Sequence, residues 1–529
     1  MKKLTNFIFV FFLYSIGFAQ EIPLPKITKS EIFKDKYKDS NIQLIANDGK
    51  DGVIIVRSES GGFIIKDQKG FIIELFDSNL KLKGQVEILK DDFPKEIKNY
   101  NFLGVVTNND KVHVIGYYFN KKTEKYTCSA NTTSILDNKF TETILFEVED
   151  FKKQEGAGTK VLKGYASLFG VKSDYTEYAN FLTNNSKDAF AIKIAVPNKV
   201  SEKFKLFSFS SNLDKKVECE YDSKIKASKF DFKDFELSPN GDYIYLLSKI
   251  ETENNKSKDK GGKYQLNFTK LNSTSQKTIS MSVKNHFCDD VTILTNKNFL
   301  KCVGFYSDKN DYRYKGIAVY NIDFENFTII NTKFNPFTPQ FIEDKYGKLK
   351  DKELRNLEID NFKINDNNEI IFNAEERYIT TTYQHSMNGM GGTTTTYHFN
   401  DIVSAKIDTE NNLIWARNIN KKQSTNGINS DFFSFTSASV GINNYLFINS
   451  SEKPRKITNN RIEFKESSRN RSNINMIRFD EKGDFDFIEI LDDKQNEMPF
   501  LIGRGVQIEN SVYFIGRDGK KKQLLKVTI

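Results

Sequence analysis

Histidine, cysteine and tryptophan are scarce in this chain, with 4, 4 and 1 copies among 529 residues. The sequence has no G-x-S-x-G nucleophile motif, no H-E-x-x-H zinc motif and no C-x-x-C pair. Each of those patterns places particular side chains for a particular chemistry. Calcium loops of the D-x-D-x-D-G type are missing as well. We therefore expect no catalytic residues, no metal site and no cofactor.

Long apolar runs are also missing after residue 19, so we expect no transmembrane segment in the mature chain. The formal net charge of +8 is small for 529 residues, and no basic block with interleaved aromatic residues is present. Such a block is typical of nucleic-acid-binding proteins, so we expect no nucleic-acid partner. Apolar residues make up 38% and charged residues 28%, a mixture that favours a folded protein with thin cores over a disordered or membrane protein.

The N-terminus has the three parts of a secretory signal peptide. They are the positive Lys2 and Lys3, the apolar stretch Leu4–Phe18, and the small residues Gly17 and Ala19 before a cleavage site. We expect residues 1–19 to be removed and residues 20–529 to form one propeller domain. Because the next residue is Gln20 rather than Cys, the chain is not expected to be a lipoprotein. We predict an exported protein, periplasmic or extracellular.

Phe (46 copies) and Tyr (23 copies) are abundant, which favours strands. Short apolar strands recur after turns rich in Asn, Asp and Gly, and two further apolar strands around an Asp- or Asn-centred turn follow each one. The pattern gives units of about four strands at about 40–90, 98–150, 161–222, 230–283, 287–334, 356–420, 430–491 and 500–529. We predict an all-β fold, a single β-propeller of four-stranded blades. Eight blades are favoured; seven is the alternative because residues 150–200 are irregular. The competing fold, two stacked β-sandwiches, would not need so regular a period.

The last unit ends at the C-terminus without a fourth strand, while the segment Lys26–Phe33 has no unit of its own. An N-terminal strand that completes the last blade would close the ring and cover two sheet edges. We therefore predict that the two ends of the chain pair with each other.

Two segments resemble known proteins. The sequence FELSPNGDY at residues 235–243 resembles a strand and turn of the WD40-like repeats in TolB-type propellers, which implies fold alone. Residues 336–423, including PFTPQFIEDKYGKLKDKELRNLEI and TTTTYHFNDIVSAKIDTENNLIWARNINKKQ, are similar to a group of exported proteins common in Bacteroidota. That resemblance implies a secreted, propeller-like protein of this phylum. No activity is known for the group, so it implies no site residues.

Two insertions interrupt the repeat. Over residues 341–359 the apolar residues recur at about helical spacing with charges between them, and they are Ile342, Tyr346, Leu349, Leu354 and Leu357. We predict a surface helix here that covers a blade edge, with partner binding as the alternative.

The second insertion, residues 378–399, has two Thr-rich halves on either side of a turn that contains glycine. We predict a long hairpin centred near Gly389, with Tyr383 opposite Thr395 and Thr381 opposite Tyr397. This exposed polar element holds two of the four histidines, so it is our candidate for the border of a binding surface. The candidate binding residues are Tyr383, His385, Tyr397 and His398. The alternative is an elaborated hairpin that packs on its neighbour.

Cysteines and carboxylates give weaker signals. Cys288 and Cys302 flank a predicted hairpin, and an exported protein can form a disulfide there; the alternative is that all four cysteines are buried as small apolar residues. Adjacent carboxylates such as Glu375 and Glu376 point to opposite faces of a strand. Such pairs therefore do not predict a joint catalytic site.

These observations favour a monomeric, non-enzymatic propeller that binds a protein or a cell-envelope glycan through one face, or a component of an envelope machine. The alternative is a carbohydrate-active enzyme, a glycoside hydrolase or lyase, that uses carboxylates in the central channel. Carboxylates and aromatic residues clustered at the channel mouth would favour the enzyme. Ser, Thr and apolar residues there would favour the scaffold.

Overall fold

The structure is a computed structural model. It describes residues 24–529 apart from 49, 51, 62–66, 94–96, 135–138, 150–178, 199, 252–263, 282, 284–285, 309–312, 351–353, 385–391, 427–429, 452, 460, 467–472, 495 and 497. The predicted signal peptide lies outside the described residues.

The described residues form eight sheets, and all their strand pairs are antiparallel except that of β26 with β30. The first three sheets after the N-terminal segment contain β3 (Asp39–Asn47), β4 (Val53–Gly61), β5 (Asp67–Phe76) and β6 (Leu82–Leu89); β7 (Ile97–Asn108), β8 (Lys111–Asn120), β9 (Lys125–Ser134) and β10 (Thr141–Val148); and β11 (Ala179–Thr183), β12 (Ala189–Val196), β13 (Ser201–Ser210) and β14 (Lys215–Lys226). The next two contain β15 (Phe230–Leu237), β16 (Ile244–Glu251), β17 (Tyr264–Leu271) and β18 (Gln276–Met281); and β19 (Phe287–Thr295), β20 (Leu300–Ser307), β21 (Gly316–Ile322) and β22 (Ile329–Pro336).

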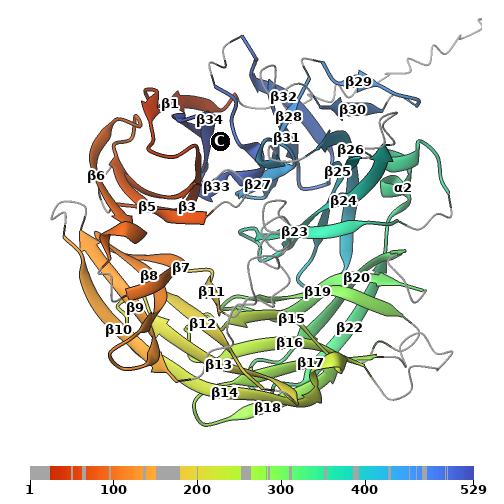
Figure 1. The fold of residues 1–529 in the computed structure, drawn as a ribbon. Helices are drawn as coiled ribbons and strands as arrows, with labels where there is room; N and C mark the ends of the chain where they lie inside the picture. The colour runs from red at the N-terminus through yellow and green to blue at the C-terminus, as the bar shows by residue number, and fades with distance from the viewer. Residues whose placement is uncertain are drawn as a thin grey trace, which may run out of the picture.

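The remaining sheets follow the same order with additions. They contain β23 (Leu357–Ile364), β24 (Ile370–Gln384), β25 (Gly392–Ile407) and β26 (Leu413–Thr425), extended by β30 (Ile462–Lys465) and β29 (Arg455–Lys456); β27 (Phe435–Val440), β28 (Asn443–Ser450), β31 (Asn473–Phe479) and β32 (Phe485–Leu491); and β33 (Val506–Ile508), β34 (Ser511–Asp518) and β35 (Lys521–Thr528), joined by β1 (Lys26–Lys29) and β2 (Phe33–Lys34). Figure 1 shows the sheets around a common centre, with the first strand of each innermost. This is a β-propeller, as predicted.

The two ends of the chain meet in one sheet. β1 pairs with β35, with Ile27 opposite Val527, and β2 pairs with the same strand. The N-terminal segment is also held by an ion pair, because Oδ2 of Asp35 lies 2.7 Å from Nη1 of the buried Arg57. The prediction that an N-terminal strand completes the last sheet is therefore confirmed.

Apolar side chains fill the spaces between neighbouring sheets. Phe146 of β10 and Phe207 of β13, for example, stack with their ring centroids 3.7 Å apart, and both are buried. Ile55 of β4 and Leu524 of β35 share another such cluster across the closure. Fully burying a side chain of this size contributes about 1.5–3 kcal/mol, so many thin cores together hold the ring.

The predicted helix over residues 341–359 is shorter in the structure. Helix α2 spans Pro339–Tyr346, and it is the one α-helix in the described part of the chain. It ends because Gly347 adopts a left-handed conformation with φ of 74°, and Leu354 then forms a β-bridge with Tyr314 instead of a further helical turn. No helix in the described ranges is long and apolar enough to cross a membrane.

The proposed disulfide between Cys288 and Cys302 is not formed, because the structure has both thiols free and buried. Strand register explains the difference: Cys288 lies opposite Tyr306 and Cys302 lies opposite Ile293. Four residues of extended strand cover about 13 Å, whereas a disulfide needs Cα atoms within about 7 Å.

Candidate functional site

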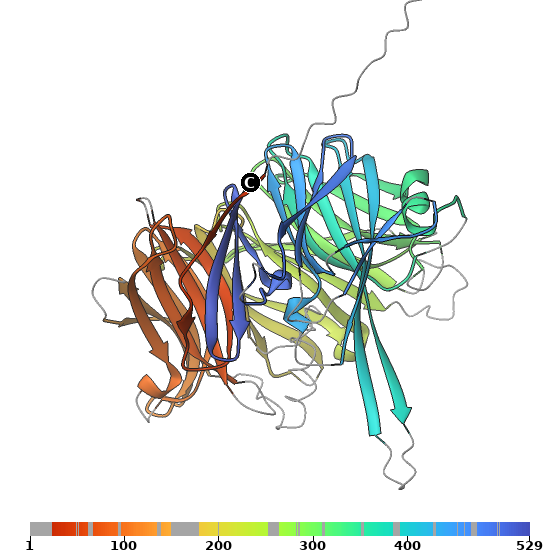
Figure 2. The same ribbon diagram turned by 90° about the horizontal axis from the view of Figure 1, so that it is seen from above.

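The hairpin of β24 and β25 is the largest departure from the repeat. These strands are 15 and 16 residues long, whereas β23 has 8. The ladder between β23 and β24 ends at Glu376, and the ladder between β26 and β25 ends at Tyr397. Figure 2 shows the rest of the hairpin, in teal, projecting away from the body of the propeller.

The register of the hairpin differs from the predicted one. Thr381 lies opposite Thr395, and Tyr383 lies opposite Thr393, so the pairing is shifted by two residues. A shift of two keeps every side chain on the same face. Because runs of threonine occupy both strands, both registers place threonines opposite one another, and the sequence alone does not distinguish them.

The structure does not bring Tyr383 together with the candidates Tyr397 and His398. Tyr383 is 57% exposed on the projecting part, whereas Tyr397 is buried at the base. The ring of His398 stacks on Tyr378 with centroids 4.3 Å apart, and its Nε2 lies 2.9 Å from Oγ1 of Thr380. His385 lies outside the described residues. Among the three candidates that the structure describes, Tyr383 is therefore the most exposed to a partner.

A bulge marks the base of the hairpin. The register of β24 and β25 shifts between Glu375 and Arg377, and bulges bend the strand that contains them. Lys345 of α2 binds there, with its Nζ 2.9 Å from Glu376 and 2.6 Å from Asp401. Burial alone would lower the pKa of Lys345, but the two carboxylates raise it above its usual value. The ammonium therefore stays charged and fixes the bulge.

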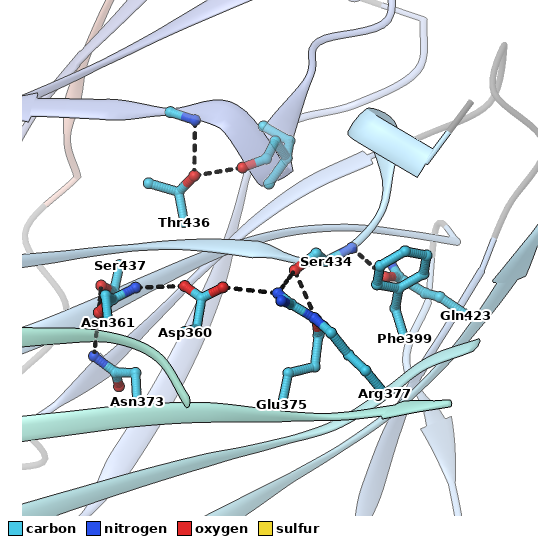
Figure 3. Close-up of polar contacts among 12 residues, drawn as sticks. Asp360, Asn361, Asn373, Glu375, Arg377, Phe399, Gln423, Ser434, Thr436 and Ser437 are labelled. Carbon is cyan, nitrogen blue, oxygen red and sulfur yellow. Dashed lines mark hydrogen bonds and ion pairs between the residues drawn. The ribbon is translucent and has the colours of Figure 1, made fainter. Parts of the chain in front are cut away.

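Buried charged side chains also stabilise this bulge, through contacts of Glu375 with its neighbours (Figure 3). Glu375 is fully buried, and its carboxylate lies 2.6 Å from Nε of Arg377 and 2.5 Å from Nζ of Lys421. The hydroxyl of Ser434 donates to the same carboxylate at 2.7 Å. Burial would raise the pKa of Glu375, but Lys421 and Arg377 lower it. Glu375 and Glu376 thus have different partners, as their adjacency on a strand predicts.

The network continues from the hairpin base to the channel wall. Nη2 of Arg377 donates to Asp360 of β23 at 2.7 Å, and the other oxygen of Asp360 accepts from Asn361 at 2.5 Å. Oδ1 of Asn361 accepts from Ser437 at 2.6 Å. Figure 3 shows this chain of contacts. We did not predict these residues; the one signal in the sequence is the charged triplet 375–377 inside a strand that has no other charged residue.

A cavity of about 540 Å³ lies where the innermost strands of five sheets meet. Its wall has three carboxylates and four phenylalanines, namely Asp234, Glu236, Asp360, Phe102, Phe181, Phe235 and Phe362. Carboxylates and aromatic residues together are the arrangement that favours a carbohydrate-active enzyme.

The three carboxyl groups of this cavity differ in their hydrogen-bond partners and in their burial. Asp234 accepts from the backbone N–H of Ile293 at 2.9 Å and from the hydroxyl of Thr292, so it joins two neighbouring sheets. Asp360 is held by Arg377. Burial raises the pKa of Glu236 to about 8, with a further contribution from the charge of Asp234. Glu236 is therefore mostly protonated at neutral pH, and its Oε1 accepts a hydrogen bond from the backbone N–H of Leu237 at 2.9 Å.

Comparison with known proteins found similar solved structures alone. No family model and no curated protein matches the chain. Similar solved structures include the propeller domain of the Trilobed protease from Pyrococcus furiosus, at 9% identity over 72% of this chain and 92% of that one, with a TM-score of 0.30. Prolyl oligopeptidase B from Galerina marginata is similar at 9% identity over 90% of this chain and 55% of that one, with a TM-score of 0.38. The chain spans 58% of an acylaminoacyl peptidase from Pyrococcus horikoshii, at 8% identity and a TM-score of 0.30.

Proposed function

We propose that the chain is an exported, closed, eight-bladed propeller of the Bacteroidota group that it resembles, and that it is a binding module without enzymatic activity. In this proposal the projecting hairpin holds a protein partner in the cell envelope. The signal-peptide pattern at the N-terminus supports export. The eight sheets and the pairing of β1 with β35 support a closed ring.

The observation that carries the proposal is the exposed part of β24. Ile379 and Tyr383 are 55% and 57% exposed, beyond the point where β23 stops. Large exposed apolar side chains on a projecting strand are typical of recognition elements, and exposed strands recognise partners through their backbone edges. The bulge anchored by Lys345 and Arg377 fixes the hairpin before binding, which lowers the entropy lost in the complex.

Capture from the native host tests this proposal. The tagged mature chain is retrieved from a cross-linked envelope fraction, beside the double variant Ile379→Lys/Tyr383→Ala and the control Val200→Lys, which changes a 71% exposed residue elsewhere. We expect the unmodified chain and the control to retain the same protein partner and the double variant to lose it. Retention by all three contradicts the proposal.

The lining of the channel cavity favours a second candidate, a carbohydrate-active enzyme. Glu236 would be the acid, because its raised pKa keeps it protonated, and the phenylalanines would stack on sugar rings. Asp234 and Asp360 are each held by bonds within the protein, which leaves the general base unassigned and makes this candidate the weaker one. Release of reducing ends from a panel of glycans, abolished in Glu236→Gln, would establish the enzyme and overturn the binding module.

A further inference from the structure

The exposed edge of β24 points to a specific partner. We propose that β24 pairs edge to edge with β24 of a second copy of this chain, so that two hairpins form one continuous antiparallel sheet. This inference rests on the proposed function, because it names the partner of the same hairpin. It departs from the monomer that we expect from the sequence.

The edge is open to strand pairing. Within the described residues, Thr380, Thr381 and Thr382 pair with β25 on one side, and the ladder to β23 on the other side has already ended at Glu376. Exposed edges are usually protected by lysine, proline or inward-pointing charge. Residues 378–384 contain none of these, although 28% of the chain is charged. The sequence of this segment therefore has none of the usual protections against the addition of a strand.

The other edge of the hairpin is less accessible. On β25, Tyr397 is buried, and the hydroxyl of Thr396 donates to Asn426 at 2.7 Å. Thr394, Thr395 and Thr396 are half-buried, whereas residues 379–383 of β24 are exposed. The open edge is therefore that of β24.

The exposed side chains of β24 are complementary to a copy of themselves. Ile379 and Tyr383 lie two residues before and two residues after Thr381, so all three share one face of the strand. A twofold axis beside Thr381 would place Ile379 of each copy opposite Tyr383 of the other. Aromatic and β-branched residues are favourable cross-strand partners, and a twofold interface needs such self-complementarity. The same register places Thr381 opposite Thr381 of the second copy.

That register gives a direct cross-linking test. Opposed residues in an antiparallel pair have Cα atoms about 4.5–5.5 Å apart, a separation that a disulfide spans. The variant Thr381→Cys is oxidised in dilute solution and analysed by non-reducing electrophoresis, with Thr393→Cys on the opposite strand as the matched control. The native cysteines give little background, because Cys128, Cys288 and Cys302 are buried and Cys219 is half-buried. We expect a covalent dimer from Thr381→Cys in at least tenfold excess over the control.

Sedimentation equilibrium of the mature chain provides the second measurement. We expect a reversible monomer–dimer equilibrium that Ile379→Lys weakens at least tenfold and Val200→Lys leaves unchanged, with circular dichroism to confirm that each variant is folded. A chain that stays monomeric at all concentrations, or cross-linking of Thr393→Cys as readily as Thr381→Cys, overturns the pairing. If the chain is monomeric and the capture assay still shows a hairpin-dependent partner, self-pairing fails and the proposed function stands. If the chain dimerises through β24 but captures only copies of itself, the dimer stands and a separate envelope partner is excluded.

Discussion

The guanidinium of Arg377, at the base of the hairpin, lies 2.7 Å from the carboxylate of Asp360 in the wall of the channel cavity. The same guanidinium lies 2.6 Å from the buried Glu375. One side chain therefore connects the projecting hairpin to the innermost strand of its own sheet.

Replacing Arg377 by Met should destabilise the fold, because two carboxylates lose a cation that neutralises them. Removing one partner of a buried ion pair costs about 3–5 kcal/mol, and we expect a loss of this order in the free energy of unfolding measured with urea. Lys215→Met is the control, since Lys215 pairs with Glu218 on the surface and such pairs contribute about 0–1 kcal/mol. Equal losses in the two variants would contradict a structural role for the buried network.

Glu236 should make stability depend on pH. Its pKa of about 8 in the folded state exceeds the value of about 4.3 in an unfolded chain. Between these values the folded state keeps a proton that the unfolded state has released, so the free energy of unfolding falls as pH rises. The slope is at most about 1.4 kcal/mol per pH unit.

Glu236→Gln removes this titration, so its stability relative to the unmodified chain should rise between pH 5 and pH 8. Denaturant unfolding at several pH values measures the difference, with Glu218→Gln, on the exposed outer strand β14, as the control. Parallel pH profiles for Glu236→Gln and the unmodified chain would show that Glu236 titrates normally.

Gly483 should be sensitive to the smallest substitution. It has φ of +83°, and a Cβ there would lie 2.5 Å from Cγ of Trp415, the single tryptophan of the chain. Gly519, with φ of +58° and open space around it, provides a matched control. Strain at a left-handed position costs about 1–2 kcal/mol in both alanine variants. We expect Gly483→Ala to cost more and to shift the tryptophan fluorescence, and identical behaviour of the two variants would contradict this packing.

Ring closure can be locked by a disulfide. Thr28 of β1 lies opposite Lys526 of β35, so Thr28→Cys/Lys526→Cys should oxidise spontaneously and raise the midpoint of thermal unfolding under non-reducing conditions. Thr28→Cys/Lys521→Cys places the second thiol out of register, since Lys521 lies opposite Lys34. A disulfide that forms equally well in both pairs, or in neither, is inconsistent with the observed closure.

The strand units could be predicted from the sequence because alternation and turn residues are local signals. The predicted unit at 230–283, for example, corresponds to β15–β18, which span Phe230–Met281. The length of the helix was overestimated because the apolar spacing continues past Gly347. In the structure this glycine adopts a left-handed conformation and ends the helix. The hairpin register was wrong because the threonine runs make neighbouring registers nearly equivalent.

The site was harder to predict because it joins distant positions. Glu375 and Ser434 are 59 residues apart in sequence, and no short motif relates them. Two of the cavity carboxylates, Asp234 and Glu236, lie two residues apart on β15, whereas Asp360 comes from β23 of another sheet, so its approach to the other two depends on the ring as a whole. Exposure of Tyr383 follows from the length of the hairpin, whereas burial of Tyr397 depends on where β26 ends.

The central claim is that the hairpin, rather than the channel, recognises the partner. The most direct measurement compares capture by two single variants in the same cross-linked envelope fraction: Ile379→Lys on the hairpin and Glu236→Gln in the channel. We predict that Ile379→Lys loses the captured protein and that Glu236→Gln retains it at the level of the unmodified chain. Loss with Glu236→Gln and retention with Ile379→Lys would contradict the claim and place recognition in the channel.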